Sequence, residues 1–225
     1  MELVPPETLV RWKAAARLVA SRYPVVGLLD RVADPAALEA LFELESWTND
    51  RINAELGWLH VLPREEWVTG KPMSTVVMAA YCHPRPGGGR FSGEDRGAWY
   101  AGRTVTTALA ESVHHRTREL AEVGAFDTRV QMRVYLADIG ARFHDIRARR
   151  RGWEPLYHPT DYTRSQQFGR ELLAAGSNGV VYRSVRDPAG ECVACFRPAL
   201  VANVRVGGHY EYVWQGRPQP EVRKL

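Results

Sequence analysis

The second half of the chain carries the pattern that most constrains the fold. Residues 129–139 alternate apolar and polar side chains, which is typical of a strand with one buried face. After Gly179, short apolar segments are separated by turn residues, most clearly at 187–190 and at 207–208. This spacing predicts a β-meander, with strands at 179–184, 192–196, 200–206 and 209–214.

Helical patterns dominate the first half. Pro5-Pro6 precede an Ala/Leu/Val-rich segment that ends near Arg22, which predicts a helical extension over residues 1–24. The other predicted helices cover 34–45, 49–56, 104–123 and 162–175. The other predicted strands cover 98–101 and 73–81, and a helix is the alternative for 73–81. No regular βαβ alternation and no internal repeat is visible. We therefore expect an α+β fold, with residues 25–225 as one domain after the extension.

Composition places few limits on function. Hydrophobic residues make up 45% of the 225 residues and charged residues 25%, enough for a packed core. The net charge of +4 fits an anionic small ligand or an acidic partner and is weak evidence for nucleic acid. The arginine run at 147–151 is typical of a solvated loop.

Three further features bear on localisation and metal binding. No apolar run reaches the roughly 18 residues of a membrane span, and the first residues lack a signal-peptide pattern. An odd number of cysteines, three, indicates a reducing cytoplasm rather than a disulfide framework. Cys192 and Cys195 fall three apart in a predicted strand, so they point to opposite faces. We expect buried cysteines and no metal site.

The segment 87–111 is the first candidate for chemistry. It contains a glycine loop ending at Arg90, a short aromatic strand with Tyr100, and a helix that carries Glu111. Glycines let the backbone approach a ligand, and an arginine favours phosphate. A mobile surface loop and a solvated helix glutamate are the alternatives, and this segment alone does not decide between them.

The second candidate segment surrounds Ser184. No G-x-S-x-G elbow flanks this serine, so a serine hydrolase is excluded. A hydrogen-bonding serine that lines a cleft at a strand end and an ordinary strand serine remain as alternatives. Trp99, Tyr100 and Tyr182 could stack on a ligand ring or pack in the core.

The order of these motifs is more informative than any one of them. The sequence reads GGRF at 88–91, an aromatic strand with Tyr100, ALAE at 108–111, and GVVYRSVR at 179–186. This order resembles the RES-domain family, bacterial toxins that degrade NAD+ and are paired with Xre-like antitoxins. The resemblance implies an ADP-ribosyltransferase-like fold, a split β-sheet with a cleft for NAD+.

The resemblance also implies site residues. Glu111, Ser184, Arg90 and Tyr100 match family positions. An arginine of the first strand is expected as well, assigned here to Arg31 with Arg51 as the competitor. The implied catalytic residues are therefore Glu111, Arg31 and Ser184, and the implied substrate-binding residues are Arg90, Tyr100, Gly89 and Arg186.

The implied reaction is cleavage of the nicotinamide–ribose bond of NAD+. Arg90 and Arg31 would hold the pyrophosphate, Tyr100 would stack on nicotinamide, and Ser184 would anchor a hydroxyl or phosphate. Glu111 would stabilise the oxocarbenium-like sugar. Water or inorganic phosphate would be the acceptor, phosphate being bound by Arg186 or Arg103.

These implications fix the expected partners and the rival functions. NAD+ acts as a substrate, so no cofactor is expected, and the expected protein partner is an Xre-like antitoxin. No membrane and no direct nucleic-acid contact are expected, and a homo-oligomer stays open. The rival functions are an ADP-ribosyltransferase acting on a macromolecule and a non-enzymatic nucleic-acid module.

Overall fold

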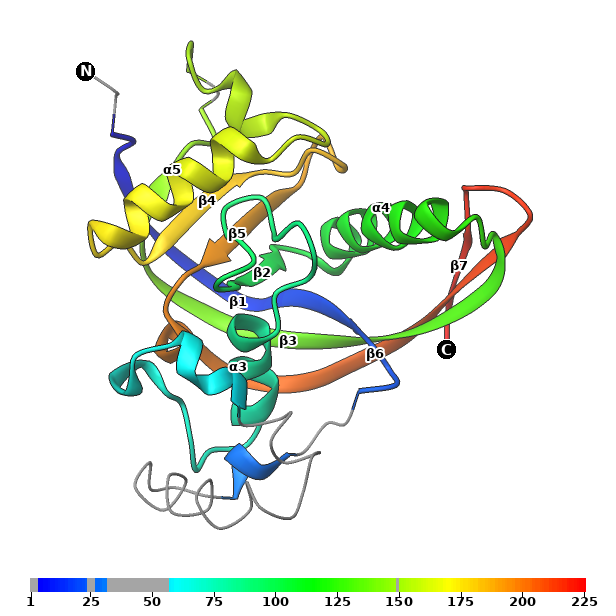
Figure 1. Ribbon diagram of the computed structural model, residues 1–225, viewed down its shortest axis with the longest axis horizontal. Helices are drawn as coiled ribbons and strands as arrows, with labels where there is room; N and C mark the ends of the chain where they lie inside the picture. The colour runs from blue at the N-terminus through cyan, green and yellow to red at the C-terminus, as the bar shows by residue number, and fades with distance from the viewer. Residues whose placement is uncertain (1–3, 24–26, 32–56, 149) are drawn as a thin grey trace.

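The computed structural model describes residues 4–23, 27–31, 57–148 and 150–225. The predicted helices at 34–45 and 49–56, the competitor Arg51 and the expected boundary at residue 24 lie outside the described residues. Within these ranges the chain has an α+β fold built on one large mixed sheet (Figure 1).

The sheet has seven strands in the described part of the chain: β1 (Glu7–Ala20), β2 (Trp99–Gly102), β3 (Asp127–Asp145), β4 (Gly179–Arg183), β5 (Glu191–Cys195), β6 (Val201–Gln215) and β7 (Glu221–Lys224). Their order is β1-β2-β5-β4-β3-β6-β7, and β1 also pairs with β3, so the first five strands of this order close into a ring. The β3–β4 pairing is parallel and the others are antiparallel.

Among the described residues, three helices pack on this sheet: α3 (Ser74–Cys82), α4 (Val105–Val123) and α5 (Thr163–Ala174). Short 3-10 turns are η1 (Leu28–Asp30), η2 (Gly57–Val61), η3 (Arg64–Glu66), η4 (Glu154–Tyr157) and η5 (Pro198–Leu200). The helices at 104–123 and 162–175 were predicted from the sequence, and both are confirmed. Thr104 caps the first turn of α4 with its side chain, and Gly124, at φ +65°, ends that helix.

The predicted N-terminal helix is wrong, because residues 7–20 form β1. This strand pairs with β3 from Glu7 opposite His144 to Ala20 opposite Met132. Buried Val10 and Trp12 alternate with exposed Arg11 and Lys13, which is a strand period. The alanines suit a helix by propensity, but here Ala15 and Ala16 are fully buried in the sheet. β1 is therefore part of the central sheet and not a helical extension.

Three other predictions fail. Residues 74–82 form α3 rather than a strand, because an apolar helix buried on several sides shows no period that distinguishes it from a buried strand. Gly207 and Gly208 lie inside β6 rather than in a turn, and Gly207 packs against Val134 and Leu136 of β3. β4 and β5 form a hairpin, but β6 pairs with β3, so the predicted meander is also wrong.

The long strands bend around the carboxylate of Asp138. Register shifts interrupt β1 between Trp12 and Ala15 and interrupt the pairing of β3 with β6 around Asp138. The Asp138 side chain accepts hydrogen bonds from the Ala14 amide at 3.1 Å and from the Asn203 amide group at 3.0 Å. Ala14 and Asn203 have φ of +58° and +50°, so this carboxylate stabilises two bulges at once.

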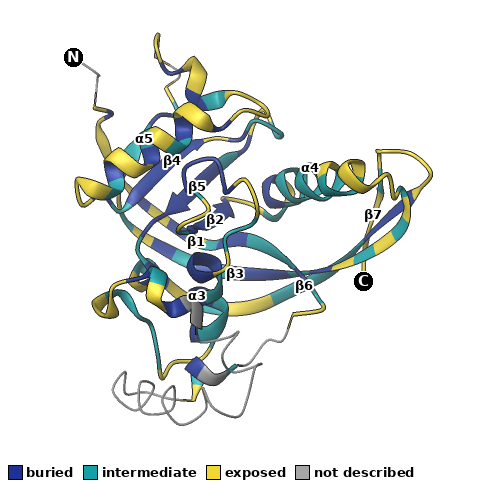
Figure 2. Ribbon diagram, in the orientation of Figure 1, coloured by how far each residue is buried: buried dark blue, intermediate teal, exposed yellow. Residues whose placement is uncertain are grey.

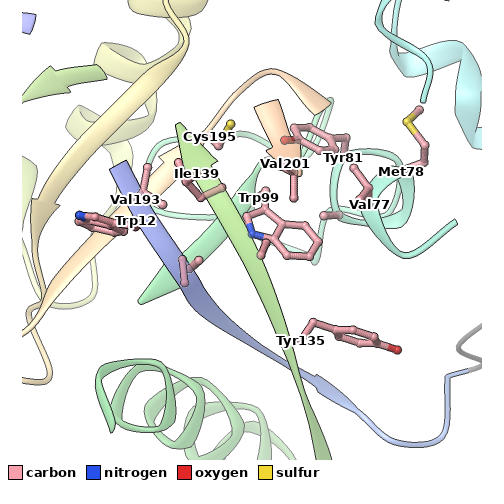
Figure 3. Packing of buried hydrophobic residues seen from close by; sticks show 14 of the residues in the cluster. Trp12, Val77, Met78, Tyr81, Trp99, Tyr135, Ile139, Val193, Cys195 and Val201 are labelled. Atoms are coloured by element: carbon pink, nitrogen blue, oxygen red, sulfur yellow. The ribbon is translucent and has the colours of Figure 1, made fainter. Parts of the chain in front are cut away.

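Each helix covers its own part of the core. The largest cluster packs α3 against the ring, with Tyr81, Trp99 and Tyr135 among its fully buried side chains (Figure 3). A second cluster joins α5 to β4 and β5, and a third joins α4 to β6. The buried residues of α4, Thr107 and Ala108, lie in its first turn, and Figure 2 shows that its far end is exposed. The start of α4 therefore lies against β1, β2 and β5, close to the predicted site residues.

Candidate functional site

The structure brings Glu111 and Ser184 into direct contact, although 73 residues separate them in the sequence. The Ser184 hydroxyl donates a hydrogen bond of 2.6 Å to Oε1 of Glu111, and the Val185 amide lies 3.3 Å from the same oxygen. Glu111 comes from the second turn of α4, and Ser184 follows the last residue of β4. These two predicted residues therefore form one polar pair.

A tight turn after β4 fixes the serine. The Ser184 Oγ accepts the amides of Arg186 at 3.0 Å and Asp187 at 2.9 Å, and the Ser184 amide donates to the Gly190 carbonyl at 2.9 Å. Ser184 is 1% exposed, so its hydroxyl has little freedom to rotate away. The side chain is presented to Glu111 in one orientation.

The glycine loop is anchored, so the alternative of a mobile surface loop does not fit. The Tyr100 hydroxyl accepts the Phe91 amide at 2.8 Å and lies 3.0 Å from the Ser92 hydroxyl. Gln166 of α5 donates to the carbonyls of Gly87 and Gly89 at 2.7 and 3.0 Å. A Cβ on Gly89 would lie 2.6 Å from the Tyr100 hydroxyl, so the loop needs glycine there.

Arg90 has a structural role in this arrangement. Its side chain donates to the carbonyls of Leu156 at 3.1 Å and His158 at 2.8 Å, and its guanidinium stacks on the Tyr162 ring at 4.7 Å. The residue is only 6% exposed. Arg90 therefore ties the glycine loop to the segment before α5.

Arg85, Arg186 and His115 form a charged face beside the Glu111–Ser184 pair, with His115 on α4 and the arginines on the segments before the glycine loop and after β4. Arg85 lies 3.1 Å from Nε2 of His115, which is one helical turn after Glu111. Burial, then the Arg85 charge, then His114 and Arg186 lower the pKa of His115 to about 2. Arg186 donates to the Pro159 carbonyl, and its Nε is buried without a hydrogen-bond partner. This concentration of positive charge favours an anionic ligand.

A cavity of about 300 Å³ opens beside this charged face. It lies between the glycine loop, α4 and the start of α5, and its lining includes Arg85, His115 and Arg118 together with the carboxylates of Glu119, Glu122 and Asp161. The loop, the cationic face and the cavity are therefore contiguous, with the Glu111–Ser184 pair one helical turn away.

Arg17 is a further candidate that sequence reasoning missed, as it missed Arg85. It lies on β1, donates to the Tyr100 carbonyl at 3.3 Å, and its guanidinium stacks on Trp99 at 5.1 Å. Burial lowers the pKa of Arg17 to about 10, with a further contribution from Arg85, so it stays charged at neutral pH. Reading β1 as a strand, from the alternation around Val10 and Trp12, would have placed Arg17 in the sheet.

Arg31 lies elsewhere. It occupies an exposed turn after η1. Its neighbour Asp30 accepts the amides of Met73 and Thr75 at the start of α3, so this turn is fixed to the first residues of that helix. In Figure 1, η1 is well separated from the start of α4. The structure therefore does not bring Arg31 to the Glu111–Ser184 pair, whereas Arg17 contacts the aromatic strand.

The remaining candidates belong to the core. Trp99 and Tyr182 are buried in clusters with aliphatic side chains. Cys192 and Cys195 lie in different clusters, as expected for opposite faces of a strand, and burial raises the pKa of Cys195 to about 11. Among the described residues, no group of three His, Cys, Asp or Glu side chains could hold a metal ion. No helix in the described ranges is long and apolar enough to cross a membrane.

A family comparison decides where this chain belongs. The model of the RES domain matches residues 59–215. The chain belongs to the RES-domain family. It is also 28% identical over 203 residues to the uncharacterized protein y4oC of Sinorhizobium fredii, covering 89% of this chain and 82% of that protein. A chain in the crystal structure of the M. tuberculosis MbcT–MbcA toxin–antitoxin complex is similar at a TM-score of 0.49 and 9% identity, covering 90% of this chain and 86% of that one.

Proposed function

We propose that this RES-domain protein cleaves the nicotinamide–ribose bond of NAD+, with inorganic phosphate or water as the acceptor. The observation that carries the proposal is the hydrogen bond between Ser184 and Glu111, close to Arg85 and Arg186 and one helical turn from a cavity. A carboxylate next to a site for an anionic ligand is the arrangement that breaking a glycosidic bond in a dinucleotide requires. Membership of the family supports the same reading.

In this proposal Glu111 stabilises the positive charge that develops on the ribose as nicotinamide leaves. The Ser184 hydroxyl and the Val185 amide both bond to Oε1, which fixes the plane of the carboxylate. Oε2 then bonds a ribose hydroxyl of the substrate. A fixed carboxylate stabilises the transition state more than a mobile one, since it needs no reorganisation during the reaction.

The pyrophosphate is bound in this proposal by Arg17 and Arg85. Arg17 takes the place that the sequence suggested for Arg31, because it contacts Tyr100 in the sheet. Arg90, Gly89 and Tyr100 keep the glycine loop in shape rather than forming the main anion contacts.

Of the two acceptors, we propose inorganic phosphate. Arg186 is the better phosphate ligand, because its Nε is buried without a partner. Arg103 instead forms an ion pair with Glu191 at 2.8 Å. If water is the acceptor, the same site releases ADP-ribose.

We further propose that the chain is the toxin of a cytoplasmic type II toxin–antitoxin system and that an Xre-like antitoxin is its partner. Expression of the chain alone is then expected to lower cellular NAD+ and stop growth, and co-expression of the antitoxin is expected to prevent both. Growth arrest with unchanged NAD+ would separate a toxin role from the proposed reaction.

The decisive experiment incubates purified protein with NAD+, with and without phosphate, and identifies the products by mass spectrometry. Free nicotinamide is expected in either case, with ADP-ribose 1-phosphate in phosphate and ADP-ribose without it. Glu111→Gln should lose activity at least about 100-fold, because the neutral amide cannot stabilise the sugar cation. Glu171→Gln, on the exposed side of α5, is the matched control. Intact NAD+ under both conditions, or full activity of Glu111→Gln, would overturn the proposal.

A further inference from the structure

We propose that Thr107 and Asp187 are positioning residues that hold the serine turn (residues 184–190) against α4 and so set the contact between Ser184 and Glu111. The expected effect of these residues on catalysis rests on the proposed function. Its structural part concerns the turn itself and can be measured without NAD+.

Thr107 connects α4 to the serine turn one helical turn before Glu111. Its hydroxyl donates a hydrogen bond of 2.8 Å to Oδ2 of Asp187, and the residue is 1% exposed. Residues four apart lie on the same helix face, so Thr107 and Glu111 both face the turn. The helix therefore contacts the turn at two successive levels.

Asp187 acts on the serine directly. Its backbone amide donates to Ser184 Oγ at 2.9 Å, while its side chain accepts from Thr107. Ser184 in turn donates to Glu111, and one turn of α4 connects Glu111 to Thr107. The contacts form a closed ring, so moving any member shifts the serine hydroxyl relative to the carboxylate.

The N-cap of α4 extends this ring. The Thr104 hydroxyl accepts the Thr107 amide at 3.2 Å and lies 2.9 Å from the Thr107 hydroxyl. Because the Thr107 hydroxyl donates to Asp187, Thr104 donates to Thr107. Such chains of hydrogen bonds polarise and strengthen one another.

Gly190 shows how closely the turn and the helix are packed. A Cβ at this position would lie 2.5 Å from the Asp187 carboxylate and 2.6 Å from the Thr107 side chain. Gly190 also donates its amide to the Asp187 carbonyl at 2.9 Å, which closes the turn. A single methyl group at residue 190 would separate the turn from α4.

The test uses Thr107→Val, Asp187→Ala, the double variant and Gly190→Ala. Thr117→Val is the control, since it removes another α4 hydroxyl, one that accepts Trp214 Nε1 at 3.4 Å on the sheet side. We expect kcat for NAD+ to fall about 10- to 100-fold in each of the first four variants, with little change in KM, because a small displacement of catalytic groups lowers the rate of the chemical step. Thr107→Ser should recover most of the rate.

The double variant is the sharpest readout. If the two side chains act through one hydrogen bond, Thr107→Val with Asp187→Ala should cost no more than the larger single change. Independent multiplication of the two effects would overturn the proposal. So would a loss of rate in Thr117→Val equal to that in Thr107→Val.

Amide hydrogen exchange followed by NMR decides the structural part even if the wild-type protein consumes no NAD+. Exchange of the Arg186 and Asp187 amides should accelerate in Thr107→Val, whereas that of Val193 in β5 should not. Unchanged exchange at residues 186 and 187 would overturn the positioning role. If the wild-type protein does not consume NAD+ but exchange accelerates in Thr107→Val, the proposed reaction is overturned and the positioning role of Thr107 and Asp187 is supported.

Discussion

Replacing Ser184 with alanine should cost both stability and activity. The hydroxyl donates to the Glu111 carboxylate at 2.6 Å and accepts two amides at 3.0 and 2.9 Å. A hydrogen bond to a charged group contributes about 1.5–3 kcal/mol, and a neutral one contributes about 0.5–1.5 kcal/mol. Water that enters the site would offset part of this sum, so we expect a loss of about 2–4 kcal/mol in the free energy of unfolding.

Ser177→Ala is the matched control. Ser177 lies just before β4, whereas Ser184 lies just after it. Ser177 is 5% exposed. Its Oγ accepts the Gly179 amide at 3.0 Å and lies 2.9 Å from Nδ1 of His144. Its removal should destabilise the protein by about 1–3 kcal/mol and leave NAD+ turnover unchanged at a temperature where both variants are folded.

The assay is urea denaturation followed by tryptophan fluorescence, combined with NAD+ turnover at 25 °C. A change in the midpoint with an unchanged slope reports stability alone. For a chain of this size the expected loss for Ser184→Ala corresponds to a fall of roughly 4–16 °C in Tm. A stability loss below about 0.5 kcal/mol would refute the hydrogen-bond argument. Equal activity of the two variants would refute the role of Ser184 in the reaction.

Three further predictions follow from single contacts. Arg17→Lys should raise the KM for NAD+ at least about 10-fold, because lysine cannot reproduce the planar guanidinium contacts. Arg31→Lys should leave this KM unchanged. Initial rates over a range of NAD+ concentrations compare the two variants. Tyr100→Phe leaves the Phe91 amide without its acceptor, so the free energy of unfolding should fall by about 1–3 kcal/mol and amide exchange in the glycine loop should accelerate. The Asn203 and Ala14 hydrogen bonds lower the pKa of Asp138 to about 2. The contribution of this carboxylate to the free energy of unfolding is therefore complete above the unfolded-state pKa near 4 and disappears as the pH falls toward 2. The difference in urea midpoint between wild type and Asp138→Asn should shrink over that range, and a constant difference would contradict the assignment.

The elements that could be predicted from the sequence are those whose ends carry local signals. Helix α4 begins after its cap at Thr104 and ends at Gly124, and α5 ends just before Gly176. The hairpin of β4 and β5 surrounds a turn that Gly190 closes with the Asp187 carbonyl. In these cases the determinants lie within a few residues of one another, so reading along the chain is sufficient.

The failures share a different cause. β1 is rich in alanine, and its conformation is decided by pairing with β3, more than a hundred residues away. The helix α3 is buried on several sides, so its apolar run has no visible period. Gly207 lies inside β6 because its missing side chain accommodates Val134 and Leu136 of the neighbouring strand. Each of these outcomes depends on long-range packing that local propensity does not describe.

The candidate site divides in the same way. Glu111 and Ser184 were predicted through the resemblance to the family, and the structure brings them together. Whether they act on NAD+ stays a prediction. Arg17 was missed because residues 7–20 were assigned to a helix, in which an arginine has no fixed relation to Tyr100. Assigning the strand correctly was therefore a condition for finding the arginine.

Small residues let β1, β2 and α4 pack closely beside the candidate site. Ala16 of β1 pairs with Gly102 of β2, and Ala16 packs with Ala108 of α4 in one buried cluster. A Cβ on Gly102 would lie 2.7 Å from the Ala108 amide nitrogen, so the three elements cross with almost no space between them. Arg17 follows Ala16 directly, and Glu111 lies one helical turn after Ala108. The close crossing of backbones thus fixes α4, and with it the Glu111 carboxylate, relative to β1 and β2. A larger side chain at residue 102 would move the start of α4 away from these strands even if the core repacked around it.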